Sequence, residues 1–303
     1  MRRITALPAP VTGAALMVLL IANTIAWSPL LLTAILARAI LPKQRWRRRA
    51  GRVVEFVAAN WMRVNLWFVD RFLEIDWQVN IEADVSLERS YIITANHQSW
   101  VDILALYKAV LGKVPFLRFF LKHQLIYIPI LGLAWWGLDF PFMRRYTKEQ
   151  IEKNPALKGK DLETTRRACD RFRDRPVSIL NFLEGTRFRE AAHAKKQSPY
   201  DHLLKPRAGG LAFAMSAMGD QLHSLLNITL AYPKGVGELW DFLCGRVPEI
   251  VVHVEERPIP RHFFTGDYQN DPEFRAEFQA WTAELWAEKD QRLQALLNPD
   301  RMR

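Results

Sequence analysis

The chain has 303 residues, of which 50% are hydrophobic and 24% are charged, and this composition excludes a disordered, collagen-like or disulfide-scaffold protein. Its formal net charge is +10 and its sequence pI is about 9.7. A basic protein of this kind attracts polyanions, so nucleic acid and anionic lipid are the two candidate partners.

The first predicted element is an apolar segment at residues 11–37 that has no ionisable side chain. As a helix it would be about 40 Å long, which exceeds the roughly 30 Å hydrocarbon core of a bilayer. Proline removes a backbone donor, so Ser28-Pro29 predicts a break near the middle. Basic residues before the segment (Arg2, Arg3) and after it (43–52) place both ends on the cytoplasmic side. We therefore expect a re-entrant helical hairpin rather than a full span or a cleaved signal peptide.

Residues 53–72 follow with apolar side chains at roughly helical spacing among charged ones. Trp61 and Trp67 suit the headgroup boundary, and the preceding basic cluster attracts anionic lipid, so we expect a helix that lies at the membrane interface. A core helix with a solvated basic end is the alternative. The chain is thus expected to have two parts, a membrane anchor with a basic interfacial helix at residues 1–74 and an α/β domain at residues 75–303.

From about residue 77, short β-rich runs alternate with helical stretches, which is typical of an α/β layer fold. The last helix begins with Asp271-Pro272, a suitable pair for an N-cap and a first turn. Its apolar stripe of Phe274, Phe278, Trp281 and Leu285 predicts a face packed in the core. Strands are expected at residues 77–81, 91–95, 178–182, 228–232 and 250–255, and helices at residues 101–111, 162–172, 209–218 and 272–297.

A polar cluster follows the second predicted strand, where the sequence reads Asn96-His97-Gln98-Ser99-Trp100-Val101-Asp102. Folds of the α/β class place their sites at the carboxyl edge of the sheet, and Asp102 in the first turn of the next helix can fold back to His97. A carboxylate on one ring nitrogen fixes the tautomer and stabilises the imidazolium. The other ring nitrogen is then left to act as a general base.

The spacing His-x4-Asp is weak evidence by itself. With seven histidines in the chain it is expected about 0.4 times by chance. A second copy is present at His262 and Asp267, and because no predicted strand leads into it we interpret that copy as accidental. On spacing alone, an ordinary capping or core role for His97 remains open.

Two groups of arginines accompany this cluster. The strand predicted at residues 178–182 runs into Leu183-Glu184-Gly185-Thr186-Arg187, where the glycine allows backbone to approach a ligand closely. Earlier in the chain, Arg144 and Arg145 follow an apolar run. The planar guanidinium of arginine suits bidentate binding of phosphate. Either group alone is typical of a surface charge, whereas together they predict an anion-binding pocket beside the base.

These segments resemble the sequence blocks of the glycerolipid acyltransferases, the family typified by 1-acyl-sn-glycerol-3-phosphate acyltransferase. Asn96-His97-x4-Asp102 resembles the first block, Phe142-x-x-Arg145 the second, Phe182-x-Glu184-Gly185-Thr186-Arg187 the third and residues 227–233 the fourth. The order and separation of the blocks also match, over residues 77–258. Phe188 and residues 229–232 are similar to the branch that includes eukaryotic lysocardiolipin-type enzymes. The resemblance implies an α/β fold with a mixed sheet flanked by helices and an N-terminal membrane-inserted helical segment.

The resemblance also implies an activity, the transfer of a fatty acyl chain from acyl-CoA or acyl-carrier protein to a glycerol hydroxyl. With lysophosphatidic acid as acceptor, its 2-hydroxyl is acylated and the product is phosphatidic acid. His97 would deprotonate the hydroxyl while Asp102 holds the ring, without an acyl-enzyme, a metal or a tightly bound cofactor. The residues implied to bind the phosphorylated acceptor are Arg145, Glu184, Gly185, Thr186 and Arg187.

Other readings of the same residues remain. Another lysophospholipid, as in lipid remodelling, or an aminolipid precursor is the alternative acceptor. A non-catalytic basic protein that binds anionic membranes or nucleic acid is a more distant alternative, but the basic cluster is already explained by topology and no nucleic-acid motif is recognisable. The expected partners are a phospholipid bilayer, a lysophospholipid and an acyl thioester. The expected location is a membrane, at the cytoplasmic face of a bacterial inner membrane.

Overall fold

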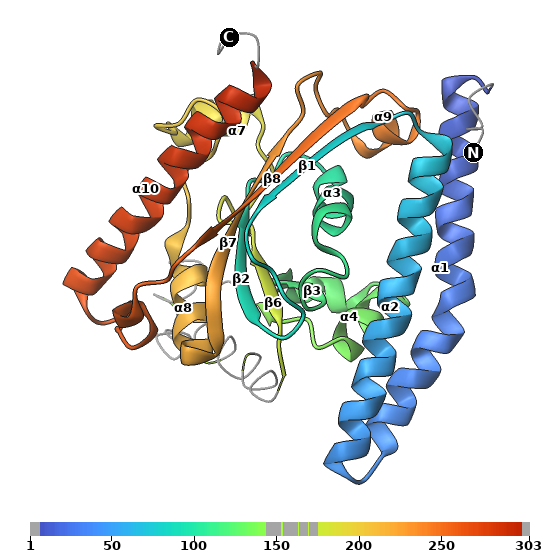
Figure 1. The fold of residues 1–303 in the computed structure, drawn as a ribbon, viewed down its shortest axis with the longest axis horizontal. Coiled ribbons are helices and arrows are strands. Elements are labelled where there is room, and N and C mark those ends of the chain that lie inside the picture. The colour runs from blue at the N-terminus through green and yellow to red at the C-terminus, as the bar shows by residue number, and fades with distance from the viewer. Residues whose placement is uncertain (1–6, 144–152, 154–162, 164–168, 170–174, 299–303) are drawn as a thin grey trace. The chain divides into compact units, whose positions relative to one another are not determined.

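The computed structural model describes residues 7–143, 153, 163, 169 and 175–298. The chain divides into two compact units. The first consists of Met1–Asp76, Gln124–Phe140 and Lys234–Glu249, and the second of Trp77–His123, Pro141–Pro233 and Ile250–Arg303. Each unit is described by itself below, with the elements labelled as in Figure 1.

The first unit is built on two long helices, α1 (Ala9–Ile40) and α2 (Gln44–Phe72), which run side by side (Figure 1). Near the middle of α1 the amide of Asn23 donates to Asn65 Oδ1 at 2.8 Å, and Trp61 Nε1 donates to Thr24 Oγ1 at 3.2 Å. The helix α1 is apolar and long enough to cross a membrane, with a mean hydropathy of 2.0, and only 17% of its most apolar window is buried.

The predicted break at Ser28-Pro29 is wrong, because α1 continues without interruption through Pro29. Two hydroxyl groups near the proline donate to carbonyls of the same helix. Ser28 Oγ donates to the carbonyl of Thr24 at 2.5 Å, and Thr33 Oγ1 donates to the carbonyl of Pro29 at 2.7 Å. Apolar helices tolerate an internal proline where neighbouring helices, Ser or Thr side chains or small backbone adjustments compensate for the lost hydrogen bond.

Two shorter segments of the first unit pack against α1. The helix α4 (Leu131–Gly137) approaches so closely that a Cβ on Gly137 would lie 2.3 Å from Ile35 Cδ1. Arg38 donates to the carbonyl of Gly137 at 2.8 Å and forms an ion pair with Asp139 at 2.7 Å. The helix α9 (Leu239–Leu243) lies at the other end of α1, where Gly13 meets Cys244.

The second unit contains a six-stranded sheet with the order β1-β8-β7-β2-β6-β3. The central strand β2 pairs in parallel with both β6 and β7, β3 pairs in parallel with β6, and β8 is antiparallel to β7. The predicted mixed α/β sheet is therefore confirmed. The strands are β1 (Asp76–Glu82), β2 (Ser90–Ala95), β3 (Leu117–Phe119), β6 (Ser178–Asn181), β7 (Leu222–Ala231) and β8 (Glu249–Arg257), and a separate pair joins β4 (Leu121–Lys122) to β5 (Phe142–Met143).

Helices cover both faces of this sheet. Because crossovers are right-handed, a chain that leaves β2 for β3 and later moves from β6 to β7 in the opposite direction places its helices on opposite faces. Figure 1 shows α3 on one face and α8 with α10 on the other. The helices of this unit are α3 (Val101–Val110), α7 (Glu190–Lys196), α8 (Ala208–Met218) and α10 (Pro272–Leu297), with short 3-10 turns at η3 (Gly219–Gln221) and η4 (Arg261–Phe264). The 3-10 turn η1 (His123–Tyr127) belongs, except for its first residue, to the first unit.

The principal core of the second unit lies under α8 and α10. Ile92, Ile179 and Leu225 occupy one row across β2, β6 and β7 and point into it. The predicted stripe of α10 also faces this core, with Phe278 and Leu285 buried and Phe274 and Trp281 packed at its edge. The helix expected at residues 162–172 falls mostly outside the described residues.

We predict that Phe278→Ala lowers the free energy of unfolding by about 3–5 kcal/mol, because it removes a fully buried ring from this core. Glu284→Ala, at an exposed position of the same helix, is the matched control and should change stability by less than about 0.5 kcal/mol. Urea denaturation followed by circular dichroism measures both. Equal effects of the two substitutions would contradict the packing assigned to α10.

Candidate active site

The site expected at the carboxyl edge of the sheet is assembled from three neighbouring strands. His97 follows β2, Glu184 follows β6 and Tyr232 follows β7. Because β6, β2 and β7 are adjacent and parallel, their carboxyl ends lie at one edge. The parallel pairing therefore brings together side chains that are far apart in the sequence.

His97 and Asp102 form the predicted pair. His97 Nδ1 lies 2.7 Å from Asp102 Oδ2, and the same oxygen accepts the main-chain N–H groups of Gln98 at 2.6 Å and Ser99 at 2.9 Å. Asp102 is completely buried, whereas 19% of the His97 side chain is exposed. Since the carboxylate accepts at Nδ1, the proton of the neutral ring is placed on Nδ1, and Nε2 is left as a basic nitrogen.

Tyr232 completes the surroundings of the aspartate. Its hydroxyl donates to Asp102 Oδ1 at 2.6 Å. Burial and the neighbouring charge of Asp102 raise the pKa of Tyr232 well above its usual range, so the phenol stays protonated and remains a donor. The carboxylate thus has four donors, which offset the cost of burying its charge.

The loop after β6 contacts His97 through three of its residues. The ring of Phe182 stacks on the imidazole, with 4.1 Å between ring centroids and 17° between planes. Glu184 Oε1 accepts the main-chain N–H of His97 at 3.1 Å, and the N–H of Phe188 donates to the His97 carbonyl at 2.6 Å. Gly185 has φ of 68°, a conformation that side chains disfavour, so this turn requires glycine.

Asn96 ties the same backbone to β7. Its side-chain amide donates to the carbonyl of Leu230 at 2.8 Å, and its oxygen accepts the N–H of Leu230 at 2.8 Å. The side chain is fully buried and pairs with Leu230 as a neighbouring strand would. Asn96 therefore extends the sheet pairing by one residue beyond β2. Its two hydrogen bonds fix the position of the backbone that leads into His97.

The residues predicted to bind the acceptor differ in how far they are exposed to solvent. The guanidinium of Arg187 lies over the exposed ring of Trp100, 5.2 Å from its centroid, and Thr186 is exposed. Glu184 instead is fully buried, and its second oxygen accepts the N–H of Leu204 at 3.3 Å. Burial raises the pKa of Glu184 to about 8. Arg145 lies outside the described residues.

A comparison with known sequences identifies the family, because the Acyltransferase family profile matches residues 76–230. The chain belongs to the acyltransferase family. This confirms the resemblance seen in the sequence blocks, whereas the roles of individual site residues stay predictions.

Several curated acyltransferases are similar to this chain. Lysocardiolipin acyltransferase 1 of Danio rerio is 28% identical over 298 residues, which cover 93% of this chain and 70% of that protein. The 2-acyl-1-lysophosphatidylinositol acyltransferase of Saccharomyces cerevisiae is 28% identical over 67% of this chain and 60% of its own length. The 1-acyl-sn-glycerol-3-phosphate acyltransferase delta of Mus musculus is 25% identical over 66% of this chain, and the match spans about half of its length, 51%.

One solved structure also aligns with the chain. It is the crystal structure of the 1-acyl-sn-glycerophosphate acyltransferase PlsC from Thermotoga maritima. The alignment covers 88% of this chain and 96% of that structure, with a TM-score of 0.47 and 17% sequence identity.

The second His-x4-Asp copy in this acyltransferase is arranged differently. His262 pairs with Glu277 at 2.8 Å on the surface. Asp267 accepts the N–H groups of Gln269 and Asn270 within its own turn, each at 3.0 Å. Each member therefore has other partners, and the copy supplies a matched control for His97.

Sequence reasoning did not assign a role to Tyr232 or to Lys289. Tyr232 directly follows the apolar run of β7, so its place at the end of a parallel strand was a usable signal. Lys289 lies within the buried stripe of α10, between Leu285 and Leu293. A single charged residue in such a stripe is a second usable signal.

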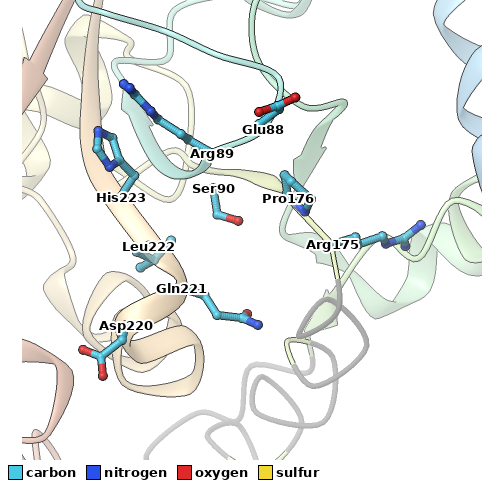
Figure 2. A pocket seen from close by; sticks show the side chains of 9 residues that line it. All are labelled: Glu88, Arg89, Ser90, Arg175, Pro176, Asp220, Gln221, Leu222 and His223. Atoms are coloured by element: carbon cyan, nitrogen blue, oxygen red, sulfur yellow. The ribbon is translucent and has the colours of Figure 1, made fainter.

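A cavity of about 490 Å³ opens at the opposite edge of the sheet (Figure 2). Its walls come from the residues that begin the strands, such as Ser90 of β2 and Leu222 of β7, together with Arg89, Arg175 and His223. Because these residues lie at the amino ends of the strands, this cavity is separate from the edge that carries His97.

We predict that Asn96→Ala destabilises the fold by about 2–3 kcal/mol, because it leaves the buried N–H of Leu230 without its acceptor and removes the shorter of the two hydrogen bonds to the Leu230 carbonyl. The control is Gln98→Ala, which removes one longer bond, 3.3 Å, to the same carbonyl and should cost less than about 1 kcal/mol. Thermal denaturation in detergent compares the two. A smaller loss for Asn96→Ala than for Gln98→Ala would show that Asn96 does not hold the strands together.

Proposed function

We propose that this protein is a membrane-bound acyltransferase that moves a fatty acyl chain from acyl-CoA or acyl-carrier protein to the 2-hydroxyl of lysophosphatidic acid, giving phosphatidic acid. The observation that carries the proposal is the His97–Asp102 pair at the carboxyl edge of the sheet, at 2.7 Å, in a chain of the acyltransferase family. A further support is the set of relatives, whose names specify lysophospholipid and acylglycerol-phosphate acceptors.

The proposed reaction is a direct transfer. His97 Nε2 removes the proton from the acceptor hydroxyl as its oxygen attacks the thioester carbonyl, and the resulting tetrahedral intermediate expels the thiolate. The imidazolium then returns its proton to that sulfur, so the products are an ester and a free thiol. Asp102 stabilises the imidazolium, and general-base catalysis of this kind contributes about 10²–10⁴-fold to the rate.

The acceptor phosphate is assigned to the arginines. Arg187 lies beside Trp100, the residue before α3, and a guanidinium there can bind phosphate with two parallel hydrogen bonds. Arg145 is proposed as the second ligand of the acceptor phosphate, from the sequence block alone. Gly185 and Thr186 are proposed to shape the turn around the headgroup. The thioester is already activated, so the proposed chemistry uses no metal or bound cofactor.

A second acceptor class has specific support. The relative that matches 93% of this chain is a lysocardiolipin acyltransferase, which favours a remodelling activity on a lysophosphodiester. The phosphate ligands proposed above suit either acceptor, because both carry an anionic phosphate next to the glycerol hydroxyl. The two candidates therefore differ in what lies beyond the phosphate, and an acceptor panel separates them.

The membrane attachment is assigned to α1 and α2, at the cytoplasmic face of a bacterial inner membrane. An unbroken α1 is about 48 Å long, so it cannot return to its starting side as a hairpin of its own. If α1 crossed the bilayer, the Asn23–Asn65 bond would place Arg63 of α2 near the bilayer centre, at a cost of about 3 kcal/mol. We therefore propose that both helices lie in the plane of the interface, which keeps the basic residues at both ends of α1 on one side.

We predict that His97→Ala lowers kcat for acyl transfer by at least about 100-fold, because the general base is lost. The assay offers oleoyl-CoA with lysophosphatidic acid, lysophosphatidylinositol or monolysocardiolipin in mixed micelles. His262→Ala, which alters the second His-x4-Asp copy, is the control and should retain activity within about twofold, since surface substitutions away from a site have small effects.

Retained turnover in His97→Ala would contradict the proposed base. Activity on lysophosphatidic acid alone would support the first acceptor, and activity on another lysophospholipid alone would support remodelling. If the wild type is inactive with every acceptor, acyl-carrier-protein donors are tested, and inactivity with those as well contradicts the enzymatic proposal.

A labelling experiment tests the in-plane arrangement of α1. Single cysteines at positions 7 and 40, in a background where Cys169 and Cys244 are replaced by serine, mark its two ends. We expect a membrane-impermeant maleimide to label both positions in inverted membrane vesicles and neither in right-side-out vesicles. Labelling of the two positions from opposite sides would demonstrate a full span.

A further inference from the structure

A short segment of the first unit, residues 124–138, is apolar but exposes much of its surface. It has no charged side chain, and it forms most of η1 and all of α4. Five large apolar side chains along it are exposed, and they are Tyr127, Ile128, Ile130, Leu133 and Trp136. Soluble monomers rarely expose large contiguous apolar patches, and a concentration of this kind marks a surface that meets an apolar partner.

The helix α4 presents its large side chains outward. Leu133 and Trp136, which lie one turn apart on one face, are 47% and 45% exposed. The residues of α4 that are buried are the small ones, Gly132, Ala134 and Gly137. A surface helix of a soluble domain has the opposite arrangement, with an apolar stripe inward and polar side chains outward. The outward face of α4 is therefore the face that an apolar partner would cover.

Two glycines explain why the small residues of α4 face inward. A Cβ on Gly132 would lie 2.0 Å from the carbonyl oxygen of Ile126, and a Cβ on Gly137 would lie 2.3 Å from Ile35 Cδ1. Only glycine permits such close approach of α4 to η1 and to α1. Close packing on the small-residue side leaves the large side chains on the other side.

The backbone at the exposed turn between η1 and α4 is suited to an apolar environment. Pro129 has no N–H group, and the N–H of Ile128 donates to the carbonyl of Leu125 at 3.2 Å. The N–H groups of Leu131 and Gly132 donate to the carbonyls of Pro129 and Ile128, at 2.6 Å and 2.8 Å. Hydrocarbon offers no partner for a backbone N–H, so a segment that enters lipid must satisfy these groups internally.

Two observations favour a lipid bilayer as the apolar partner. Tyr127 and Trp136 are residues of the types that concentrate at the membrane–water interface. In addition, Arg38 of α1 donates to the end of α4, and Leu36 and Ile40 beside it in the sequence are exposed. The segment thus adjoins the helix that is long and apolar enough to cross a membrane. With seven residues, α4 is too short to span a bilayer, so its contact is shallow.

We propose that residues 124–138 form a second membrane contact, in which Tyr127, Leu133 and Trp136 insert into the lipid interface beside α1. This inference rests on the proposed attachment of α1 to the membrane and does not depend on the proposed acyl transfer. The segment lies between β4 and β5 in the chain, so it interrupts the sequence of the second unit. The α/β domain is then tied to lipid through its own chain as well as through the N-terminal helices.

The first test measures the depth of the segment in a bilayer. A nitroxide spin label is attached to the full chain at Leu133→Cys, in a background where Cys169 and Cys244 are replaced by serine. Ile25→Cys on the exposed face of α1 is the lipid reference, and Glu284→Cys on the surface of α10 is the water reference. The vesicles contain phosphatidylethanolamine and phosphatidylglycerol. Collisions with oxygen, which concentrates in lipid, are compared with collisions with a water-soluble nickel chelate.

We expect the labels at positions 133 and 25 to collide more with oxygen and the label at position 284 to collide more with nickel. A label at position 133 that behaves like the one at 284 would overturn the inference, whatever the label at 25 shows. A label at 25 in water with the label at 133 in lipid would contradict only the proposed attachment of α1. Spin–spin broadening at position 133 that disappears on dilution with unlabelled protein would identify a second copy as the partner instead, and would also overturn the inference.

A second measurement asks whether the outward face is packed against protein. Leu133→Ala should change the melting temperature in detergent by less than about 2 °C, because it alters an exposed side chain. Leu138→Ala, which alters a buried leucine directly after the same helix, is the matched control and should lower it by at least about 4 °C. An equal loss in the two variants would show that Leu133 is packed inside the protein, which is incompatible with a membrane contact.

Discussion

The buried carboxylate of Asp102 is the constraint on which the candidate site depends. An isolated charge in a protein interior is so costly that it must be paired and hydrogen-bonded, and here the four donors come from two parts of the chain. Residues 97–99, directly after β2, supply the His97 ring and two main-chain N–H groups, and Tyr232, directly after β7, supplies its hydroxyl. The carboxylate is satisfied only when β2 and β7 are adjacent, parallel and in register. The geometry that stabilises the fold is therefore the same geometry that orients the imidazole.

A second set of buried hydrogen bonds joins the same strands away from the Asp102 carboxylate. Thr94 Oγ1 donates to Asn227, and Asn227 donates to Glu255, so a line of hydrogen bonds crosses from β2 through β7 to β8. Asn96, one residue beyond the end of β2, adds its two hydrogen bonds to Leu230. Buried networks of this kind are stabilising only when every member finds a partner, and they penalise any slip in strand register. Through them, the antiparallel strand β8 is tied to β7 and β2, the strand that His97 follows.

Local sequence patterns correctly predicted the elements whose structure depends mainly on their own residues. The apolar runs before His97 and Glu184 became β2 and β6, and Asp271 caps α10 with bonds to the N–H groups of Glu273 and Phe274. The predictions failed where a distant or unusual contact decides the outcome. The helix α1 continues through Pro29 and packs against α2, β3 is only three residues long, and α4 is held by Arg38, which lies about a hundred residues away in the chain. The position of Glu184 behind His97 also depends on Leu204, which no local pattern connects to it.

The distribution of apolar surface bears on how such an enzyme would meet its substrates. In the first unit, α1 exposes Val18, Ile21, Ile25 and Leu36, as expected for a helix in contact with lipid. Among the described residues of the second unit, Leu87 and Trp100 are the large apolar side chains with similar exposure. Trp100 lies directly between His97 and α3 in the sequence, and it carries the guanidinium of Arg187 over its ring. An exposed indole beside an arginine offers an apolar face next to a phosphate ligand, which is the combination that an acceptor with an acyl chain and an anionic headgroup requires. The placement of Trp100 therefore supports an amphiphilic acceptor independently of the histidine chemistry.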